Sequence, residues 1–487
     1  MQRTLGRDTA SSNSEGSRRM RSSFRFAVLL AAIVALSGGG CGGGSSAVGT
    51  AQGQTTQSED VVTLPNATQT IAQPANTNLN VNRFERLRFA DQYPGSDIGA
   101  QVNSAIADLG SAGGVVEIPA GSYAFSTTIT INQPYTWVRC QGWATILTYT
   151  GSGTAVMMGD STTPGSNPAT ISAVRFSNCT LRGPGTGIGI YMQGGLKEGN
   201  YIDRVNFDST GLGFQTFIMH SDLSGGMTYD NYIQNNRILL NNGQSSTYSG
   251  IGIDVSNKSH NLIISNNIIH RKLPDGVTTG SDNSICLRIA DSTNVKVVDN
   301  DIEGCGAALI QLGLTAFESR PTNTTIIRGN YFEPLDAATI NVDVGKYTTG
   351  TLIEGNFMNG DSLQNYMIQV EDCSYGTVIQ NNTHLGVVSA VINNLTNSCT
   401  QALTIAGNTV SGSTAPYLQG TKGIVYWQDP NLQTVTLGST TYANLPPVAS
   451  KPNGTQLYCS DCTIAAACAA GGTGAIAKSI NGAWVCN

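Results

Sequence analysis

The chain has 487 residues, of which 40% are hydrophobic and only 12% are charged, and it carries 57 glycines and a net charge of −6. A chain of this length can bury a large core, and so weak and negative a charge excludes the basic surface that binding to nucleic acid requires. We therefore expect a large folded protein without a nucleic-acid partner.

Residues 1–40 have the pattern of an export signal. Arginines precede an apolar run over Phe26–Leu36, which is too short to cross a bilayer and is followed by small residues. Met20 is an alternative start that would give a signal of more usual length. Cys41 resembles a bacterial lipoprotein acceptor, although Leu36 stands further from it than that pattern requires. We expect a protein that is secreted or on the outer surface of a bacterium, with membrane contact only through a lipid at Cys41.

The composition divides the rest of the chain into three parts. Residues 41–80 are rich in Gly, Ser, Thr, Gln and Asn without an apolar period, which is typical of a flexible linker. Residues 81–415 contain the apolar alternations of a folded domain. Residues 416–487 contain four closely spaced cysteines and are predicted to form a small separate module.

One amphipathic helix is predicted near the start of the folded part. Ser96 or Asp97 can cap its first turn. Its apolar face consists of Ile98, Val102, Ile106 and Leu109. Two glycines end the helix, and a strand is expected over Val115–Ile118.

The middle of the chain repeats a short unit, of which Gly250–Ile269 is the clearest copy. An asparagine returns in the same apolar setting at positions 236, 267, 300, 330, 356, 382 and 408, so the interval is 26 to 33 residues. Short apolar alternations broken by Gly, Asn, Asp and Ser favour strands and leave no room for a helix in each repeat. Such a period predicts stacked coils of three short strands, with like strands parallel and about 4.8 Å apart. The repeated asparagines are expected to form an inward-facing ladder.

The run GGVVEIPAGSY at residues 113–123 resembles the opening strand of pectate-lyase-superfamily proteins. The resemblance extends over about Phe89–Val410 and implies an all-β fold, a right-handed parallel β-helix. It also implies that the preceding helix caps the first coil. The superfamily includes lyases, hydrolases, epimerases and phage tailspikes, so the resemblance implies the fold more than one chemistry.

One strand in each coil presents a polar residue between two apolar ones, and alternation directs that residue outward. Such a column mixes acidic, basic, amide and aromatic side chains, which suits a carbohydrate ligand. A solvated strand face is the alternative. The column is predicted to contain Tyr191, His220, Asp254, Arg288, Gln311, Asp343 and Gln369.

The polygalacturonase family of pectin hydrolases carries its catalytic sequence motifs on these same strands. In this chain Asp254 and Asp282 match two of the acidic positions, whereas Cys305 stands between two glycines where that family has a histidine. The other aspartates of the family pattern are also absent. The chain therefore departs from a standard inverting pectin hydrolase.

Two chemistries are compatible with the remaining residues. Asp254 and Asp282 lie on neighbouring coils and could form the carboxyl pair of a hydrolase, which needs a separation of about 5–9.5 Å. For β-elimination, Arg288 would hold a uronate carboxylate while Lys272 or His270 takes the proton. The sequence shows no cluster of three or four acids at stacked positions that would indicate a metal site. We therefore expect no cofactor, and only calcium is left open.

These patterns predict an exported carbohydrate-active protein that cleaves an acidic, pectin-like polysaccharide by lyase or hydrolase chemistry. The alternative is a non-catalytic surface protein that binds glycans, like an adhesin or tailspike. The polysaccharide, its linkage and the oligomeric state are not specified by the sequence.

Cysteine spacing predicts disulfides in two places. Cys373 and Cys399 are 26 residues apart, like Asn356 and Asn382 in the ladder, which puts them at matching points of adjacent coils within bridging distance. Two buried thiols are the alternative. In the C-terminal module, export favours two disulfides over a zinc site. Its cysteines are Cys459, Cys462, Cys468 and Cys486.

Overall fold

The computed structural model describes residues 86–487 with the exception of several short segments. These are 160–170, 194–195, 197, 209–211, 222–227, 241–248, 272–282, 314–321, 335–338, 361–365, 387–389, 396–401, 412–417, 420–423, 428–438, 449–455 and 466. The predicted export signal, the linker, Met20 and Cys41 all precede residue 86 and so lie outside the described residues. Among the described residues no helix is long and apolar enough to cross a membrane.

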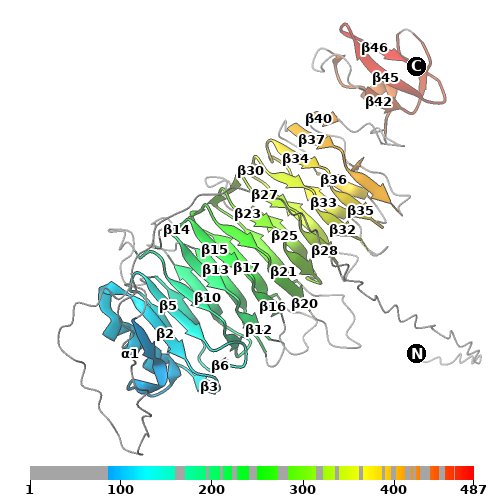
Figure 1. Cartoon of the computed structure of the whole chain (residues 1–487). Coiled ribbons are helices and arrows are strands. Elements are labelled where there is room, and N and C mark those ends of the chain that lie inside the picture. Colours follow the sequence, from blue (N-terminus) through cyan, green and yellow to red (C-terminus); the bar gives the residue numbers. More distant parts are fainter. Residues whose placement is uncertain are drawn as a thin grey trace, which may run out of the picture. The chain divides into compact units, whose positions relative to one another are not determined.

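The central part of the chain is a right-handed parallel β-helix, which confirms the predicted fold (Figure 1). Sheet 1 has 13 parallel strands in this order: β1 (Leu87–Phe89), β2 (Gly114–Ile118), β5 (Thr136–Cys140), β8 (Arg175–Ser177), β11 (Asn200–Asp203), β15 (Asn231–Gln234), β19 (Ile263–Ser265), β23 (Lys296–Val298), β27 (Ile326–Arg328), β31 (Leu352–Glu354), β34 (Thr377–Gln380), β37 (Ala402–Ala406) and β40 (Ile424–Trp427).

Two sheets of 11 strands form the other long faces. Sheet 2 consists of β4 (Ile129–Ile131), β7 (Thr154–Met158), β10 (Ile188–Gln193), β13 (Thr216–Ser221), β17 (Ile251–Ser256), β21 (Ile285–Ile289), β25 (Ala308–Leu312), β29 (Ile340–Val344), β33 (Tyr366–Val370), β36 (Ala390–Asn394) and β39 (Leu418–Gln419). Sheet 3 consists of β3 (Ser122–Phe125), β6 (Ile146–Tyr149), β9 (Thr180–Arg182), β12 (Asn206–Phe207), β16 (Arg237–Leu240), β20 (Ile268–Arg271), β24 (Asp301–Glu303), β28 (Tyr331–Glu333), β32 (Phe357–Asn359), β35 (Thr383–Leu385) and β38 (Thr409–Ser411).

A short parallel sheet lies between sheets 2 and 1 along the chain. Sheet 4 consists of β14 (Thr228–Tyr229), β18 (Ser259–His260), β22 (Ser292–Thr293), β26 (Thr322–Asn323) and β30 (Thr348–Thr349). One coil therefore runs through sheet 2, sheet 4, sheet 1 and sheet 3 before the chain returns to sheet 2. Strands β39 and β40 continue the pairing beyond residue 415.

The predicted asparagine ladder is present at the turn from sheet 1 to sheet 3. Asn300 shows the pattern: its Nδ2 donates to Oδ1 of Asn330 at 3.0 Å and to the carbonyl of Ile264 at 3.0 Å, while its Oδ1 accepts from Nδ2 of Asn267 at 2.9 Å. The ladder residues are 1–5% exposed. Each buried amide bonds to the coils before and after it, and Asn300 also donates within its own coil, to the carbonyl of Val298 at 3.0 Å. The bonds between coils fix the register of the stack.

The interior of the β-helix is apolar, and helix α1 (Ile98–Leu109) covers its first coil. Its buried face includes the predicted Ile98, Val102, Ile106 and Leu109, and the helix packs against β2, β3 and β4 (Figure 1). Asp97 is the N-cap, since its Oδ1 accepts from the amide of Ala100 at 2.9 Å. The predicted helix, its cap and its covering role are confirmed. Short 3-10 turns lie at η1 (Ala90–Gln92) and η2 (Gly110–Ala112).

Disulfides link the coils at two places that the sequence did not predict. Cys140 pairs with Cys179, and Cys286 pairs with Cys305. Cys373 is also disulfide-bonded, but Cys399 lies outside the described residues, so the predicted bridge between them stays a prediction.

The C-terminal module has its own small core. It contains η3 (Tyr442–Asn444), one sheet of β41 (Ser439–Thr440), β42 (Gln456–Cys459), β45 (Ala475–Ile480) and β46 (Ala483–Cys486), and a pair of strands, β43 (Cys462–Thr463) and β44 (Ala469–Ala470). Its core is built around four cysteines. The two predicted disulfides are present, as Cys459–Cys462 and Cys468–Cys486.

Replacing Asn300 with alanine tests the ladder. We expect the free energy of unfolding to fall by about 1–3 kcal/mol, because the change leaves buried polar partners of neighbouring coils unpaired. Thr409→Ala, on an exposed position of β38, is the control and should change stability by less than about 0.5 kcal/mol. Denaturant unfolding measures both, and equal effects of the two changes would contradict a stabilising role for the buried amides.

Candidate functional site

The outward column of sheet 2 largely follows the predicted register. Tyr191 lies on this face, and Asp254 pairs in register with Arg288, which pairs with Gln311. The column continues through Asp343, Gln369 and Asn393. The strand pairing therefore brings six of the seven predicted binding and catalytic residues of this column into one row.

His220 is the exception, and its prediction as an outward residue is wrong. Its register partners are Met192 and Val255, while Met219 occupies the column beside Tyr191 and Asp254. The His220 side chain is fully buried, with Nδ1 at 2.7 Å from Oγ of Ser259. Burial lowers the pKa of His220 to about 3, so the neutral ring is part of the core.

Asp254 and Arg288 lie side by side, as predicted, and form a two-pronged ion pair. Nε of Arg288 donates to Oδ1 of Asp254 at 2.9 Å and Nη2 donates to Oδ2 at 2.5 Å. Asp254 is only 3% exposed. The pair neutralises itself, so neither charge is available for a uronate or for proton transfer without breaking a strong interaction.

Asp343 is the titratable group in this column with the most altered acidity. Burial, followed by the negative charge of Glu371, raises its pKa to about 6, although Gln369 and Gln311 act in the opposite direction. Nε2 of Gln369 donates to its Oδ1 at 3.2 Å. The predicted catalytic residues Lys272 and Asp282 lie outside the described residues, so their roles stay predictions.

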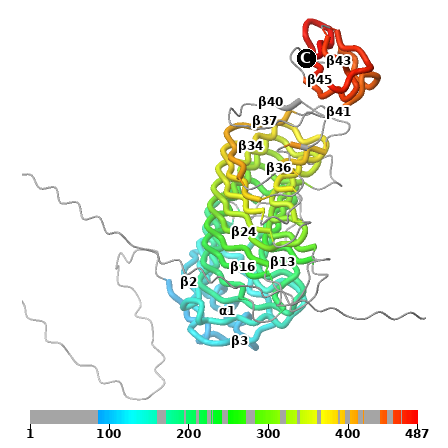
Figure 2. Tube along the Cα trace, turned by 90° about the vertical axis from the view of Figure 1, so that its right-hand side faces the viewer, coloured from blue at the N-terminus to red at the C-terminus, as the bar shows by residue number. Residues whose placement is uncertain are grey.

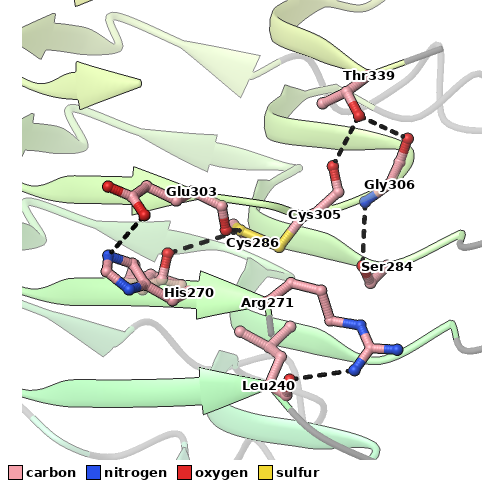
Figure 3. The surroundings of a disulfide bond; sticks show 10 residues. Leu240, His270, Arg271, Ser284, Cys286, Glu303, Cys305, Gly306 and Thr339 are labelled. Carbon is pink, nitrogen blue, oxygen red and sulfur yellow. Dashed lines mark hydrogen bonds and ion pairs between the residues drawn. A yellow bond between two sulfur atoms is a disulfide. The ribbon is translucent and has the colours of Figure 1, made fainter. Parts of the chain in front are cut away.

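A second titratable cluster lies on the outward face of sheet 3, on strands β20 and β24. Nε2 of His270 lies 3.3 Å from Oδ2 of Asp301 and 3.5 Å from Oε2 of Glu303. Figure 3 shows His270 and Glu303 directed toward each other from neighbouring strands, beside the Cys286–Cys305 disulfide. One side-chain atom of each of the three residues lies within 4.8 Å of the others. We call these three residues the sheet 3 cluster.

The two carboxyl groups of the cluster differ in acidity. The contact with His270 lowers the pKa of Asp301, whereas burial and the negative charges of Asp301 and Glu333 raise the pKa of Glu303 to about 7 against the opposing charge of His270. Burial lowers the pKa of His270, but its contacts with Asp301 and Glu303 raise it more. The cluster therefore combines an Asp301 that ionises more readily than usual with a His270 that holds its proton more strongly than usual and a Glu303 that exchanges its proton near pH 7. The role of His270 as a base stays a prediction.

Apolar and aromatic side chains flank the cluster on the same face. Tyr331 pairs in register with Asp301 on one side and with Phe357 on the other, and the two rings are stacked with centroids 5.6 Å apart. Ile268 and Phe357 are each 39% exposed. Exposed rings beside convergent polar groups are the lining that a sugar-binding site uses.

The sequence prediction missed this cluster because it considered a single strand of each coil. On this face Glu303 pairs in register with His270 on one side and with Glu333 on the other, so two acids and a histidine stand at stacked positions. His, Asp and Glu at this spacing could also hold a divalent cation. A signal was available: His270, Glu303 and Glu333 each stand three residues after a ladder asparagine.

Comparisons with known proteins agree on the fold. No family model and no curated protein sequence matches the chain. Among solved structures, DFA-IIIase from Arthrobacter chlorophenolicus A6, without its lid and in complex with GF2, matches at 12% identity with a TM-score of 0.51, covering 72% of this chain and 97% of that chain. A GH87 alpha-1,3-glucanase from Streptomyces thermodiastaticus strain HF3-3 matches at 15% identity and a TM-score of 0.44, covering 75% of this chain and 70% of that one. The match to the DFA-IIIase structure agrees with the parallel β-helix fold of this chain.

The protonation of His270 is testable by NMR. We expect its imidazole to titrate above the ordinary value of 6.5, because two carboxylates stabilise the charged ring. Glu303→Gln should lower the midpoint, since it removes one negative charge next to the ring. Glu354→Gln, on sheet 1, is the matched control and should leave it unchanged. A midpoint that Glu303→Gln does not move would show that the two groups do not interact.

Proposed function

We propose that the protein is a polysaccharide-processing enzyme that hydrolyses glycosidic bonds at the sheet 3 cluster. The observation that supports this most directly is the pair Asp301 and Glu303, whose carboxyl groups lie close together with pKa values moved in opposite directions. Such a pair supplies a proton donor and an ionised carboxylate in one place, which glycoside hydrolysis requires.

The roles follow from the acidities. Glu303, protonated below about pH 7, donates its proton to the glycosidic oxygen as the bond to the sugar carbon breaks. The ionised Asp301 forms the new bond to that carbon, because oxygen atoms of the two carboxyl groups lie within 4.8 Å of each other, which is too close for the water that an inverting enzyme holds between them. Water then attacks the covalent intermediate, gives a proton to Glu303 and releases Asp301. The contact with His270 lowers the pKa of Asp301 and so favours its ionised form, which makes His270 a positioning residue.

The face around the cluster favours a neutral glycan. Asp301, Glu303 and Glu333 place three carboxyl groups together with His270, so a uronate would bring a further negative charge to an acidic surface. On sheet 2, Arg288 is already held by Asp254. A neutral sugar ring can lie on Phe357 or Ile268 without this cost, so a neutral polysaccharide fits the site better than a pectin-like one.

We also propose that the enzyme works outside the cell. The export-signal pattern of residues 1–40 supports this location, and a lipid at Cys41 would retain the enzyme at the surface of a bacterium. Four disulfides among the described residues suit an oxidising compartment.

Substitution of Glu303 tests the catalytic assignment. Glu303→Gln and Asp301→Asn should each lower the release of reducing ends from the neutral polysaccharide that the wild-type protein cleaves by about 10²–10⁴-fold, the usual contribution of an acid–base group. Glu354→Gln, a carboxylate paired with Arg328 on sheet 1, should leave the rate unchanged.

The panel should include dextran, xylan, a mixed-linkage β-glucan, inulin, an alpha-1,3-glucan and polygalacturonate. Full activity of Glu303→Gln would show that the catalytic site lies elsewhere, and Asp343 on sheet 2 would be the next residue to test. A wild-type protein that binds but cleaves none of them would instead be the non-catalytic glycan-binding protein that the sequence left as its alternative.

The pH profile gives an independent test. We expect kcat/KM to fall as the pH rises through about 7, because deprotonated Glu303 can no longer donate a proton. His270→Gln removes the positive charge that lowers the pKa of Glu303, so the alkaline limb should move to higher pH. An alkaline limb that stays in place in His270→Gln would contradict the coupling.

A further inference from the structure

A column of aromatic and cationic side chains, with one isoleucine among them, runs along the outward face of sheet 1, away from the strands of the sheet 3 cluster. The register places one of them on each successive coil: Trp137, Arg175, Tyr201, Tyr232, Ile263 and Lys296. The Arg175 guanidinium lies 4.8 Å from the ring centroid of Trp137. Tyr201 and Tyr232 are stacked, with centroids 4.5 Å apart and planes 7° apart. The rings therefore lie face to face along the stacking direction of the coils.

A cavity of about 200 Å³ opens at the end of this column, lined by Tyr232, Ile263, Lys296 and three residues of the adjoining turns. Tyr232 and Lys296 are two coils apart in register, which is about 9.6 Å, and Ile263 lies between them. Tyr201 covers one face of the Tyr232 ring. The cavity, which we call the slot, therefore lies on the side of the other face of that ring. The slot thus has an aromatic wall, an aliphatic floor and an ammonium group on the far wall.

The turns from sheet 4 to sheet 1 supply the polar groups of the slot. Asp230, Asn261 and Asn294 have φ values of 57°, 51° and 56°, so the same left-handed turn recurs on three successive coils and places their side chains in one row. Nδ2 of Asn294 donates to Oδ1 of Asn261 at 2.7 Å. All three line the cavity, which therefore offers a carboxylate, two amides and an ammonium group beside one tyrosine ring.

We propose that this slot is a non-catalytic binding site for a pyranose residue of a neutral polysaccharide. The C–H face of a pyranose can lie against Tyr232 while its hydroxyls donate to Asp230 and accept from Lys296, with the two amides able to do either. The cavity has the volume of about seven water molecules at about 30 Å³ each, which suits one sugar residue rather than a folded partner. Four polar residues among six exclude a purely apolar ligand.

The charges of the slot select against an anionic sugar. Asp230 and Lys296 line the same cavity, so a hydroxyl can use both, whereas a uronate that pairs with Lys296 would also bring its charge near the Asp230 carboxylate. Asp230 is the single carboxylate among the described lining residues, so the slot lacks the acid pair that hydrolysis needs. This proposal does not depend on the function proposed for the sheet 3 cluster. If both hold, the slot anchors a chain that is cut elsewhere.

Affinity electrophoresis in gels that contain a polysaccharide tests the slot. The full chain with Glu303→Gln should be used, so that cleavage does not remove the ligand and loss of activity cannot be mistaken for loss of binding. Separate gels contain dextran, xylan, a mixed-linkage β-glucan or polygalacturonate. We expect at least one neutral polysaccharide to retard the protein, and we expect Tyr232→Ala and Lys296→Met each to weaken that retardation at least tenfold.

Arg328→Gln, an exposed cation on the same sheet but outside the slot, is the matched control and should leave retardation unchanged. Thermal unfolding of every variant separates a binding defect from misfolding. Retardation by none of the neutral polysaccharides would overturn the proposal. So would retardation by polygalacturonate alone, or retardation that neither Tyr232→Ala nor Lys296→Met weakens in variants that unfold like the parent.

Discussion

The asparagine ladder is the constraint on which the rest of the structure depends. Each buried amide must find its partners in the coils above and below, so a shift of one residue in any coil would leave several polar groups unsatisfied. The ladder thereby fixes the positions of the residues that come after it on sheet 3. The residues directly after three successive ladder asparagines are Asp301, Tyr331 and Phe357. The residues three positions after a ladder asparagine include His270, Glu303 and Glu333. The site is thus a consequence of the register. Figure 2 shows the stacked coils along which these positions repeat.

The two outward faces show how neighbours decide what a carboxylate can do. Asp254 and Glu303 both stand on strands with an outward register, but Asp254 is held by a guanidinium in the next coil, whereas Glu303 has carboxylates beside it. The first arrangement holds the carboxylate in an ion pair, whereas burial and neighbouring carboxylates raise the pKa of Glu303 to about 7. Asp343 on sheet 2 also has a raised pKa of about 6, but sheet 3 alone of the two described faces places such a group beside a carboxyl group whose pKa is lowered, which is why sheet 3 supports the proposed chemistry.

The repeat predicted the stacked parallel coils and the ladder, and an amphipathic pattern predicted the helix, because each rests on a periodic pattern that one sequence displays. The right-handed β-helix and the capping role of the helix came with the family resemblance. The register of sheet 2 was also predictable where an apolar residue flanks the outward position on both sides, as at Asp254 and Arg288. The prediction of this register failed at His220, because β13 directs the apolar Met219 outward and the polar His220 inward. There Ser259 and Asn231 form hydrogen bonds with the imidazole ring. Acidity was not predictable, since the pKa values of Asp301 and Glu303 depend on charges supplied by other coils.

A structure with a bound oligosaccharide tests the central claim most directly. The Glu303→Gln variant should be crystallised with an oligomer of the neutral polysaccharide that the wild-type protein cleaves. The account predicts sugar rings on Phe357 or Ile268 and a glycosidic oxygen within hydrogen-bond distance of the side chain at position 303. An oligosaccharide seated on the sheet 2 column beside Asp343, with the sheet 3 cluster unoccupied, would contradict it.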